Sequence, residues 1–261
     1  MPEGWCWSRM QVICPYGECK KIDANDISDD EWILDLEDIE KETGKIIAHI
    51  CKKERLAKST KHRFTSGQLL YSKLRPYLNK VVIADSDGYC TSEILPLSFR
   101  GDISPHYMQI FLMSNTFLDY VNMIAYGLKM PRLGTNDGLK ALIAIPSLNE
   151  QRRIYEQTKQ ALTVVENLTI NKGNLFVIIN QLKSKILDLA IRGKLVPQNP
   201  DDEPASVLLE RIRAEKEELI KAGKIKRDKK ESVIFKGEDN SYYETIGKNT
   251  VCIDEEIPFD I

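Results

Sequence analysis

Basic side chains concentrate in one stretch of this 261-residue chain, and their chemistry suits phosphate groups. Residues 52–80 hold nine basic groups and one acidic group, whereas residues 1–51 hold five basic and twelve acidic groups. Such a dense cationic block favours contact with a nucleic-acid backbone over a plain solvated surface, which remains the alternative interpretation. The side chains that we expect to contact phosphates are Lys58, Lys61, Arg63, Lys73, Arg75 and Lys80, with His62 and Tyr77 interleaved among them.

The segment MPRLGTND carries side chains of a different kind, which suit the edges of bases. An arginine such as Arg132 can bridge guanine, and an asparagine such as Asn136 can bridge adenine in the major groove. Thr135 lies between them and can bond to either base. For Asn136 the alternative interpretation is the cap of a turn, and an ordinary surface position is the alternative for each of the other side chains.

Catalytic motifs for chemistry on DNA are missing from the sequence. A methyltransferase acting on adenine needs an Asn-Pro-Pro-Tyr-like motif, and the nearest approach is Cys14, Pro15, Tyr16. A metal-dependent nuclease needs clustered carboxylates with a lysine, and no such set or phosphate-cradling loop is present. The six cysteines have no regular metal-ligand spacing. We therefore predict a protein that binds without catalysis and that uses no cofactor or metal.

Residues 1–148 are predicted to form a globular domain of mixed helices and strands. The strand signals are in GQLLYSKL, KVVIADSDGYCTSEILPLSF and LKALIAIP, with a hairpin turn expected at residues 85–88. Ser104 and Pro105 predict the start of one helix, and a second helical segment follows near TFLDYVNMIAYG. The chain as a whole is therefore expected to be an α+β protein.

An apolar residue recurs every seven positions from about Glu150 to Arg192, which predicts a coiled-coil-like helix. As a single helix this segment would be roughly 65 Å long, with a bend or frayed turn expected in the polar run 171–174. A long core helix of a bundle is the alternative. The residues expected to pair with another helix are Ile154, Ala161, Val165, Leu168, Leu175, Ile179, Leu182, Ile186 and Leu189.

A shorter helix is predicted from Pro204 to Gly223, so that residues 149–230 form a helical region that serves as a spacer. Residues 231–261 hold two basic and eight acidic groups and are expected to be an acidic linker. No apolar run approaches the length of a transmembrane helix, and the N-terminus lacks a signal pattern. These features predict a cytoplasmic location.

The helical region also resembles a known family. The segments IPSLNEQRRI, LKSKILDLAIRGKLVPQNPDDEPASVLLERIRAEKEELIKAGKIKRDKK, NSYYETIGK and EEIPFDI are similar to the central conserved region of the DNA-specificity subunit of type I restriction-modification systems. Upstream, GQLLYSKLRPYLNKVVIADSDGYCTSEILPL and GLKMPRLGTNDGLKALIAIPSLNEQRRI are similar to the end of a target recognition domain in that family. The resemblance covers nearly the whole chain and is most specific after Ile145.

The resemblance implies that residues 1–148 recognise double-stranded DNA and direct a methyltransferase subunit, and through it a nuclease subunit, to a bipartite site. Members of the family have two recognition domains held apart by paired helices, whereas this chain has one of each. The resemblance therefore indicates a half-length form that pairs with itself or with a second specificity chain, or a fragment truncated before a second recognition domain. Two alternatives remain open, a coiled-coil scaffold that does not read DNA and an inactive truncated fragment.

Overall fold

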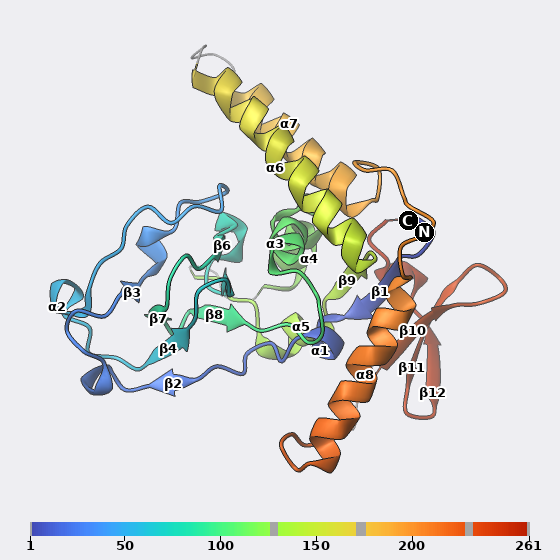
Figure 1. Ribbon diagram of the computed structural model, residues 1–261, viewed down its shortest axis with the longest axis horizontal. Helices are drawn as coiled ribbons and strands as arrows, with labels where there is room; N and C mark the ends of the chain where they lie inside the picture. The colour runs from blue at the N-terminus through green and yellow to red at the C-terminus, as the bar shows by residue number, and fades with distance from the viewer. Residues whose placement is uncertain (1, 126–129, 171–175, 228–231, 260–261) are drawn as a thin grey trace. The chain divides into compact units, whose positions relative to one another are not determined.

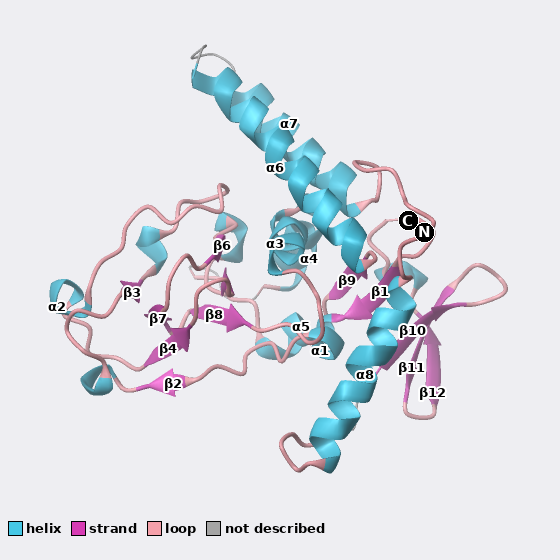
Figure 2. Ribbon diagram, in the orientation of Figure 1, coloured by secondary structure: helices cyan, strands magenta, loops and turns pink. Residues whose placement is uncertain are grey.

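The structure, a computed structural model, describes residues 2–125, 130–170, 176–227 and 232–259. Helices and strands are mixed along the chain, which confirms the predicted α+β class (Figure 2). Contacts divide the chain into a first unit of Met1–Cys14, Phe99–Thr116 and Lys140–Ile261 and a second unit of Pro15–Ser98 and Phe117–Leu139. The sequence analysis placed borders at residues 148 and 230 between regions that differ in expected function. These borders remain predictions. Within the described part of the chain, no helix is long and apolar enough to cross a membrane.

The first unit combines helices with two small antiparallel sheets (Figure 1). Its elements are β1 (Cys6–Arg9), α1 (Met10–Ile13), α3 (Pro105–Met113), β9 (Leu142–Ile145), α6 (Leu148–Ile170), α7 (Phe176–Ile191), α8 (Ala205–Lys221), β10 (Ser232–Lys236), β11 (Tyr242–Ile246), β12 (Asn249–Cys252) and the 3-10 turn η4 (Asp254–Glu256).

The start of α3 and the end of α8 follow from local sequence. The Ser104 hydroxyl accepts a hydrogen bond from the backbone N–H of Tyr107, and Pro105 occupies the first helical position of α3, as predicted. Helix α8 ends just before Gly223, whose φ of +69° is the left-handed conformation that glycine adopts without strain. These helix borders therefore depend on residues that are neighbours in the chain.

The heptad segment forms two helices, so the prediction of one continuous helix is wrong. Helix α6 ends at Ile170, α7 begins at Phe176, and the two lie side by side and also pack on α3 (Figure 1). At 1.5 Å per residue, α6 spans about 35 Å, roughly half the length predicted for a single helix. A heptad stripe favours a partner helix of any origin, and here the chain itself supplies one. The bend predicted at 171–174 lies outside the described residues.

The residues predicted to pair with another helix differ in how deeply they are buried. Ile154, Val165 and Ile179 are buried, Ala161, Ile186 and Leu189 are half-buried, and Leu182 is 44% exposed. The side chain of Leu168 and the whole of Leu175 lie outside what the structure describes. Part of the apolar stripe is thus covered inside the chain.

Replacing Ile179 with alanine is expected to lower the free energy of unfolding by about 2–3 kcal/mol, because the buried side chain would leave a cavity in the helix packing. Its neighbour Ile178 is 52% exposed, so Ile178→Ala provides a matched control that should cost no more than about 0.5 kcal/mol. Urea unfolding followed by circular dichroism at 222 nm measures both. Equal effects of the two substitutions would show that the described pairing of α6 with α7 is incorrect.

The last strands make the end of the chain a folded part of the first unit. Strands β10, β11 and β12 form an antiparallel sheet in which β11 is central, and β10 contacts β1. The ring of Phe259 packs on Trp7 of β1 with ring centroids 5.3 Å apart. Residues 232–259, which we expected to be a linker, are therefore held to the first strand by aromatic packing.

The second unit is built from short strands joined by long loops. Its elements are β2 (Lys21–Ile22), η1 (Ala24–Asp26), β3 (Ile33–Leu34), η2 (Leu36–Asp38), α2 (Lys52–Arg55), β4 (Lys61–Phe64), β5 (Leu69–Ser72), η3 (Pro76–Leu78), β6 (Val81–Ile83), β7 (Gly88–Thr91) and β8 (Ile94–Leu97), while α4 (Asn115–Ile124) and α5 (Thr135–Lys140) cross the borders between the units.

These strands form two sheets, with the orders β2-β4-β7-β3 and β6-β5-β8. Strands β6 and β7 belong to different sheets, so the predicted hairpin at residues 85–88 is wrong. The segment instead carries the chain from one sheet to the other, and polar residues at a turn do not distinguish these two connections. Turn chemistry alone therefore did not determine strand pairing.

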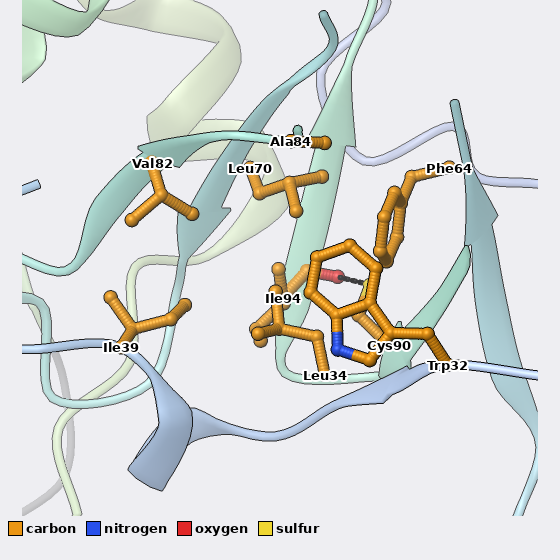
Figure 3. Packing of buried hydrophobic residues seen from close by; sticks show 9 residues of the cluster. All are labelled: Trp32, Leu34, Ile39, Phe64, Leu70, Val82, Ala84, Cys90 and Ile94. Carbon is orange, nitrogen blue, oxygen red and sulfur yellow. Dashed lines mark hydrogen bonds between the residues drawn. The ribbon is translucent and has the colours of Figure 1, made fainter. Parts of the chain in front are cut away.

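A hydrophobic core lies between the strands of both sheets (Figure 3). The ring of Trp32 meets that of Phe64 edge-on, with centroids 5.1 Å apart. Gly88 passes so close to these two rings that a Cβ there would lie 2.8 Å from Phe64 and 2.9 Å from Trp32. The core residues are Trp32, Leu34, Ile39, Phe64, Leu70, Val82, Ala84, Cys90 and Ile94. This core holds β4, from which the exposed Arg63 projects.

Candidate nucleic-acid interface

Arg55, in the basic block, is paired with acidic side chains of the preceding segment. This last residue of α2 forms an ion pair with Glu37 at 2.5 Å and another with Asp38, which is buried. These charge-assisted bonds hold the guanidinium within the second unit. Arg55 therefore serves the fold of the acidic segment and is not available to bind phosphate.

The two lysines at the start of α2 are also engaged. Lys52 lies 3.3 Å from Asp29 and Lys53 lies 2.9 Å from Asp30. Lys52 in addition donates a hydrogen bond of 2.6 Å to the backbone carbonyl of Ile27. The net charge of residues 52–80 therefore overstates the positive charge that this segment offers to DNA.

Three candidate DNA contacts, Lys61, His62 and Lys80, are turned toward the protein, and Lys61 Nζ donates a hydrogen bond of 2.8 Å to the Ser59 hydroxyl. Lys61 and His62 are both buried in β4, where His62 Nδ1 lies 2.9 Å from the backbone carbonyl of Ile94. Burial lowers the pKa of His62, and the charges of Lys73 and Lys21 lower it further. Lys80 Nζ donates a hydrogen bond of 2.6 Å to the carbonyl of Leu36. The structure thus gives these side chains intramolecular partners.

The other candidates in the basic block are accessible. Lys58, Arg63 and Arg75 are exposed, and Lys73 is half-buried. Tyr77 is 44% exposed. Strand alternation explains Arg63, because it lies in β4 between the buried His62 and Phe64.

Backbone hydrogen bonds bring the basic block next to the MPRLGTND segment. The N–H of Leu133 donates to the carbonyl of Lys73 at 3.0 Å, and the N–H of Arg75 donates to the carbonyl of Pro131 at 2.7 Å. Leu74 and Arg132 form an antiparallel bridge between these bonds. Two segments that the sequence marked separately, one for phosphates and one for bases, are therefore adjacent.

Arg132 is held in place by a carboxylate. Its Nε and Nη2 lie 3.1 and 3.2 Å from the two oxygens of Glu93, which lies between β7 and β8. The backbone N–H of Lys73 donates to the carbonyl of Glu93 at 3.0 Å, so the same residue also anchors the basic segment. A fork-to-fork pair of this kind fixes the orientation of a guanidinium.

Helix α5 places the other two candidate base contacts, since Thr135 and Asn136 form its first turn and are exposed. The helix is anchored by Tyr120, whose hydroxyl donates a hydrogen bond of 2.8 Å to the carbonyl of Asp137. Gly138 permits close packing on Tyr16, because a Cβ there would lie 2.1 Å from the ring. The position of Thr135 and Asn136 therefore depends on contacts within the second unit.

Lys21 is a cation that the sequence analysis did not select. It is exposed in β2 directly opposite His62, and its charge acts on His62 together with that of Lys73. The adjacent lysines at positions 20 and 21 were the available signal, but they lie outside the dense block. We use the name cationic cluster for Lys21 and Lys73, whose charges both act on His62, together with Arg75, which follows Lys73 in the same segment.

Metal-assisted chemistry has no evident site in the part of the chain that the structure describes. No group of three or more His, Cys, Asp or Glu side chains there has a geometry that could hold a metal ion. The carboxylate of Glu93 is paired with Arg132. The arrangement around the cationic cluster is suited to binding anions.

Comparisons with known proteins give a consistent family assignment. The chain is 30% identical over 224 residues to the Escherichia coli protein named type I restriction enzyme EcoDI specificity subunit. The aligned region covers 83% of this chain and 50% of that protein. A 51-residue stretch is 67% identical to the Escherichia coli EcoAI specificity subunit and covers 20% of this chain and 9% of that one. No family model matches the chain.

A solved structure shares the fold. The crystal structure of the HsdS subunit from Thermoanaerobacter tengcongensis superposes with a TM-score of 0.56 at 20% identity, covering 78% of this chain and 52% of that one. The chain thus spans about half the length of the EcoDI subunit and of this solved chain. The matched proteins are named as specificity subunits, in agreement with the prediction of a non-catalytic protein. This chain belongs to the family of type I restriction enzyme specificity subunits.

Proposed function

We propose that this chain recognises a DNA sequence on behalf of a type I restriction-modification complex and directs partner methyltransferase and nuclease subunits to a bipartite site. The observation that carries the proposal is its similarity to the EcoDI specificity subunit over 83% of its length. The exposed members of the cationic cluster provide a surface suited to phosphates, and Thr135 and Asn136 beside it are suited to base edges.

The experiment that tests DNA reading is selection from a pool of random duplexes with the purified chain, followed by sequencing. Recognition predicts enrichment of one sequence, with an affinity that falls steeply as salt rises because phosphate contacts release counterions. Retention of DNA without any enriched sequence would favour the scaffold hypothesis or the inactive-fragment hypothesis. The predicted cytoplasmic location is consistent with access to DNA.

Arg132→Ala is expected to reduce discrimination between the selected sequence and its single-base variants by about 1–3 kcal/mol at one position, because a bidentate contact to guanine would be lost. Competition titrations with each variant duplex measure this effect. Lys58→Ala is a suitable control, since an exposed lysine that contacts only phosphate should weaken all duplexes alike. If Arg132→Ala also weakened every duplex equally, Arg132 would be a phosphate contact.

The helical region is proposed to set the spacing of the two half-sites and to dock the methyltransferase. Val164 and Ile178 are exposed apolar residues on α6 and α7, and with Leu182 they offer a surface for a further helix. We propose that a second copy of this chain or a second specificity chain covers it. Light scattering of the purified chain tests self-association, for which a particle of about twice 29.9 kDa is expected and a monomer at all concentrations would contradict it.

A further inference from the structure

The ion pair between Arg132 and Glu93 rests on a backbone that is fixed by other contacts. The N–H of Lys73 donates to the carbonyl of Glu93 at 3.0 Å. The N–H of Arg75 donates to the carbonyl of Pro131, the residue before Arg132, at 2.7 Å. Arg75 has a φ of +47°, a left-handed conformation that is strained for a residue with a side chain and that its surroundings must hold. The positions from which the two paired side chains project are therefore set independently of the pair itself.

The pair is accessible to solvent but carries no net charge. Arg132 Nε and Nη2 lie 3.1 and 3.2 Å from the two carboxylate oxygens of Glu93, and the side chains are 40% and 24% exposed. A phosphate contact draws its affinity from positive charge that replaces condensed counterions. Beside Glu93 the positive charge of Arg132 is matched, and the carboxylate repels an approaching phosphate. The pair is therefore poorly suited to the DNA backbone.

The cationic cluster differs from the pair in this respect. Its members Lys21, Lys73 and Arg75 form no ion pair within the described parts of the chain, so their charge suits phosphates. A base edge instead presents neutral acceptors, which favour a donor group held in one orientation. The guanidinium of Arg132 has five N–H donors, and the two bonds to Glu93 fix its plane without using all of them. The pair is thus suited to a base edge.

We propose that Glu93 is a positioning residue for DNA recognition, whose carboxylate orients the guanidinium of Arg132 for guanine in one base pair and opposes contact with phosphates. The proposal rests on the proposed function and deepens it, because it assigns to one carboxylate the choice between reading a base and binding the backbone. A carboxylate at a DNA-binding surface lowers affinity for every sequence, and specificity is gained when it lowers affinity for wrong sequences more than for the right one.

Glu93→Gln tests the proposal, because it keeps the size of the side chain but removes the charge that holds the guanidinium. Competition titrations with the selected duplex, its single-base variants and an unrelated duplex measure the effect. We expect discrimination at one guanine to fall about ten-fold, since the bidentate contact loses its fixed orientation. Affinity for the unrelated duplex should rise about three-fold, and the salt dependence should steepen by about 0.9 in logarithmic slope, because Arg132 gains a phosphate contact.

These opposite changes in discrimination and in general affinity distinguish positioning from a role in folding. If Glu93 only supported the fold, Glu93→Gln would weaken the selected and the unrelated duplex alike, and that result would overturn the proposal. Asp30→Asn is the matched control, because it removes the same charge from an ion pair, with Lys53 at 2.9 Å, and should leave discrimination unchanged. Equal losses of discrimination in both variants would assign the effect to net charge and would also overturn the proposal.

Glu93→Asp keeps the test decisive if Glu93→Gln fails to fold. This variant retains the negative charge but shortens the side chain by one methylene group, so the two bonds to Arg132 cannot both keep their geometry. Discrimination at the same guanine should fall while the salt dependence stays the same. Unchanged discrimination in a folded Glu93→Asp variant would contradict a positioning role.

The wild-type titrations separate failure of this proposal from failure of the proposed function. If the wild-type chain discriminates between bases and Glu93→Gln discriminates equally well, only the role of Glu93 is wrong. If the wild-type chain shows no preference for any base, the proposed function is wrong and the role of Glu93 with it.

Discussion

Replacing Arg9 with methionine is expected to lower the free energy of unfolding by about 3–5 kcal/mol, the largest effect on stability that we predict. Arg9 ends β1, and its guanidinium donates hydrogen bonds to both carboxylate oxygens of Glu244, at 3.0 and 2.8 Å. Both side chains are nearly inaccessible to solvent. Removal of the guanidinium would leave the Glu244 carboxylate buried and uncompensated, which is the costly way to break a buried pair.

Glu256→Gln provides the control for this prediction. Glu256 also accepts a bond of 2.8 Å from Arg9, but its side chain is 56% exposed, so its loss should cost less than about 1 kcal/mol. Urea unfolding followed by tryptophan fluorescence measures both variants, because Trp7 of β1 packs on Phe259. A cost for Arg9→Met as small as that for Glu256→Gln would show that the pair does not fasten β11 to β1.

The pH dependence of stability gives an independent readout of the same pair. Burial acts to raise the pKa of Glu244, but the hydrogen bonds and charge of Arg9 outweigh it, so the pKa is lowered. A carboxyl group with a lowered folded-state pKa stabilises the fold above its unfolded pKa and loses this contribution as the pH falls through the folded value. The wild-type chain should therefore lose stability on acidification more steeply than Arg9→Met does.

Neutralising two members of the cationic cluster should produce the largest effect on DNA affinity. Lys21→Gln combined with Lys73→Gln is expected to weaken binding on the order of 100-fold, since each lost charged contact costs about 1.5 kcal/mol. The slope of the logarithm of affinity against the logarithm of salt should fall by about 1.8, or about 0.9 for each phosphate contact. Fluorescence anisotropy with the selected duplex at several salt concentrations measures both quantities.

Lys52→Gln combined with Lys53→Gln is the matched control, because it changes the net charge by the same amount. Those lysines are paired with Asp29 and Asp30, so their loss should change DNA affinity by less than about three-fold. If the two double variants weakened binding equally, affinity would depend on total charge and the cationic cluster would not be a contact surface. An unchanged affinity in both would place the DNA on another face.

The sequence by itself determined the features that depend on neighbouring residues and on family resemblance. Ser104 and Pro105 started α3, Gly223 followed the end of α8, and the mixed pattern of apolar segments predicted the α+β class. These signals are local, because caps and strand alternation involve residues a few positions apart. The resemblance of IPSLNEQRRI and the segments after it identified the family that the comparisons support.

Only the tertiary structure decided which charges and apolar faces are free. A heptad stripe is the same whether its partner helix comes from another chain or from residues 176–191, so the pairing of α6 with α7 could not be predicted. Composition likewise counts Arg55 and Lys21 equally, although folding pairs the first with Glu37 and leaves the second exposed. Burial and ion pairing depend on residues that are distant in sequence, as Arg9 and Glu244 are, and distance in space is set by the fold.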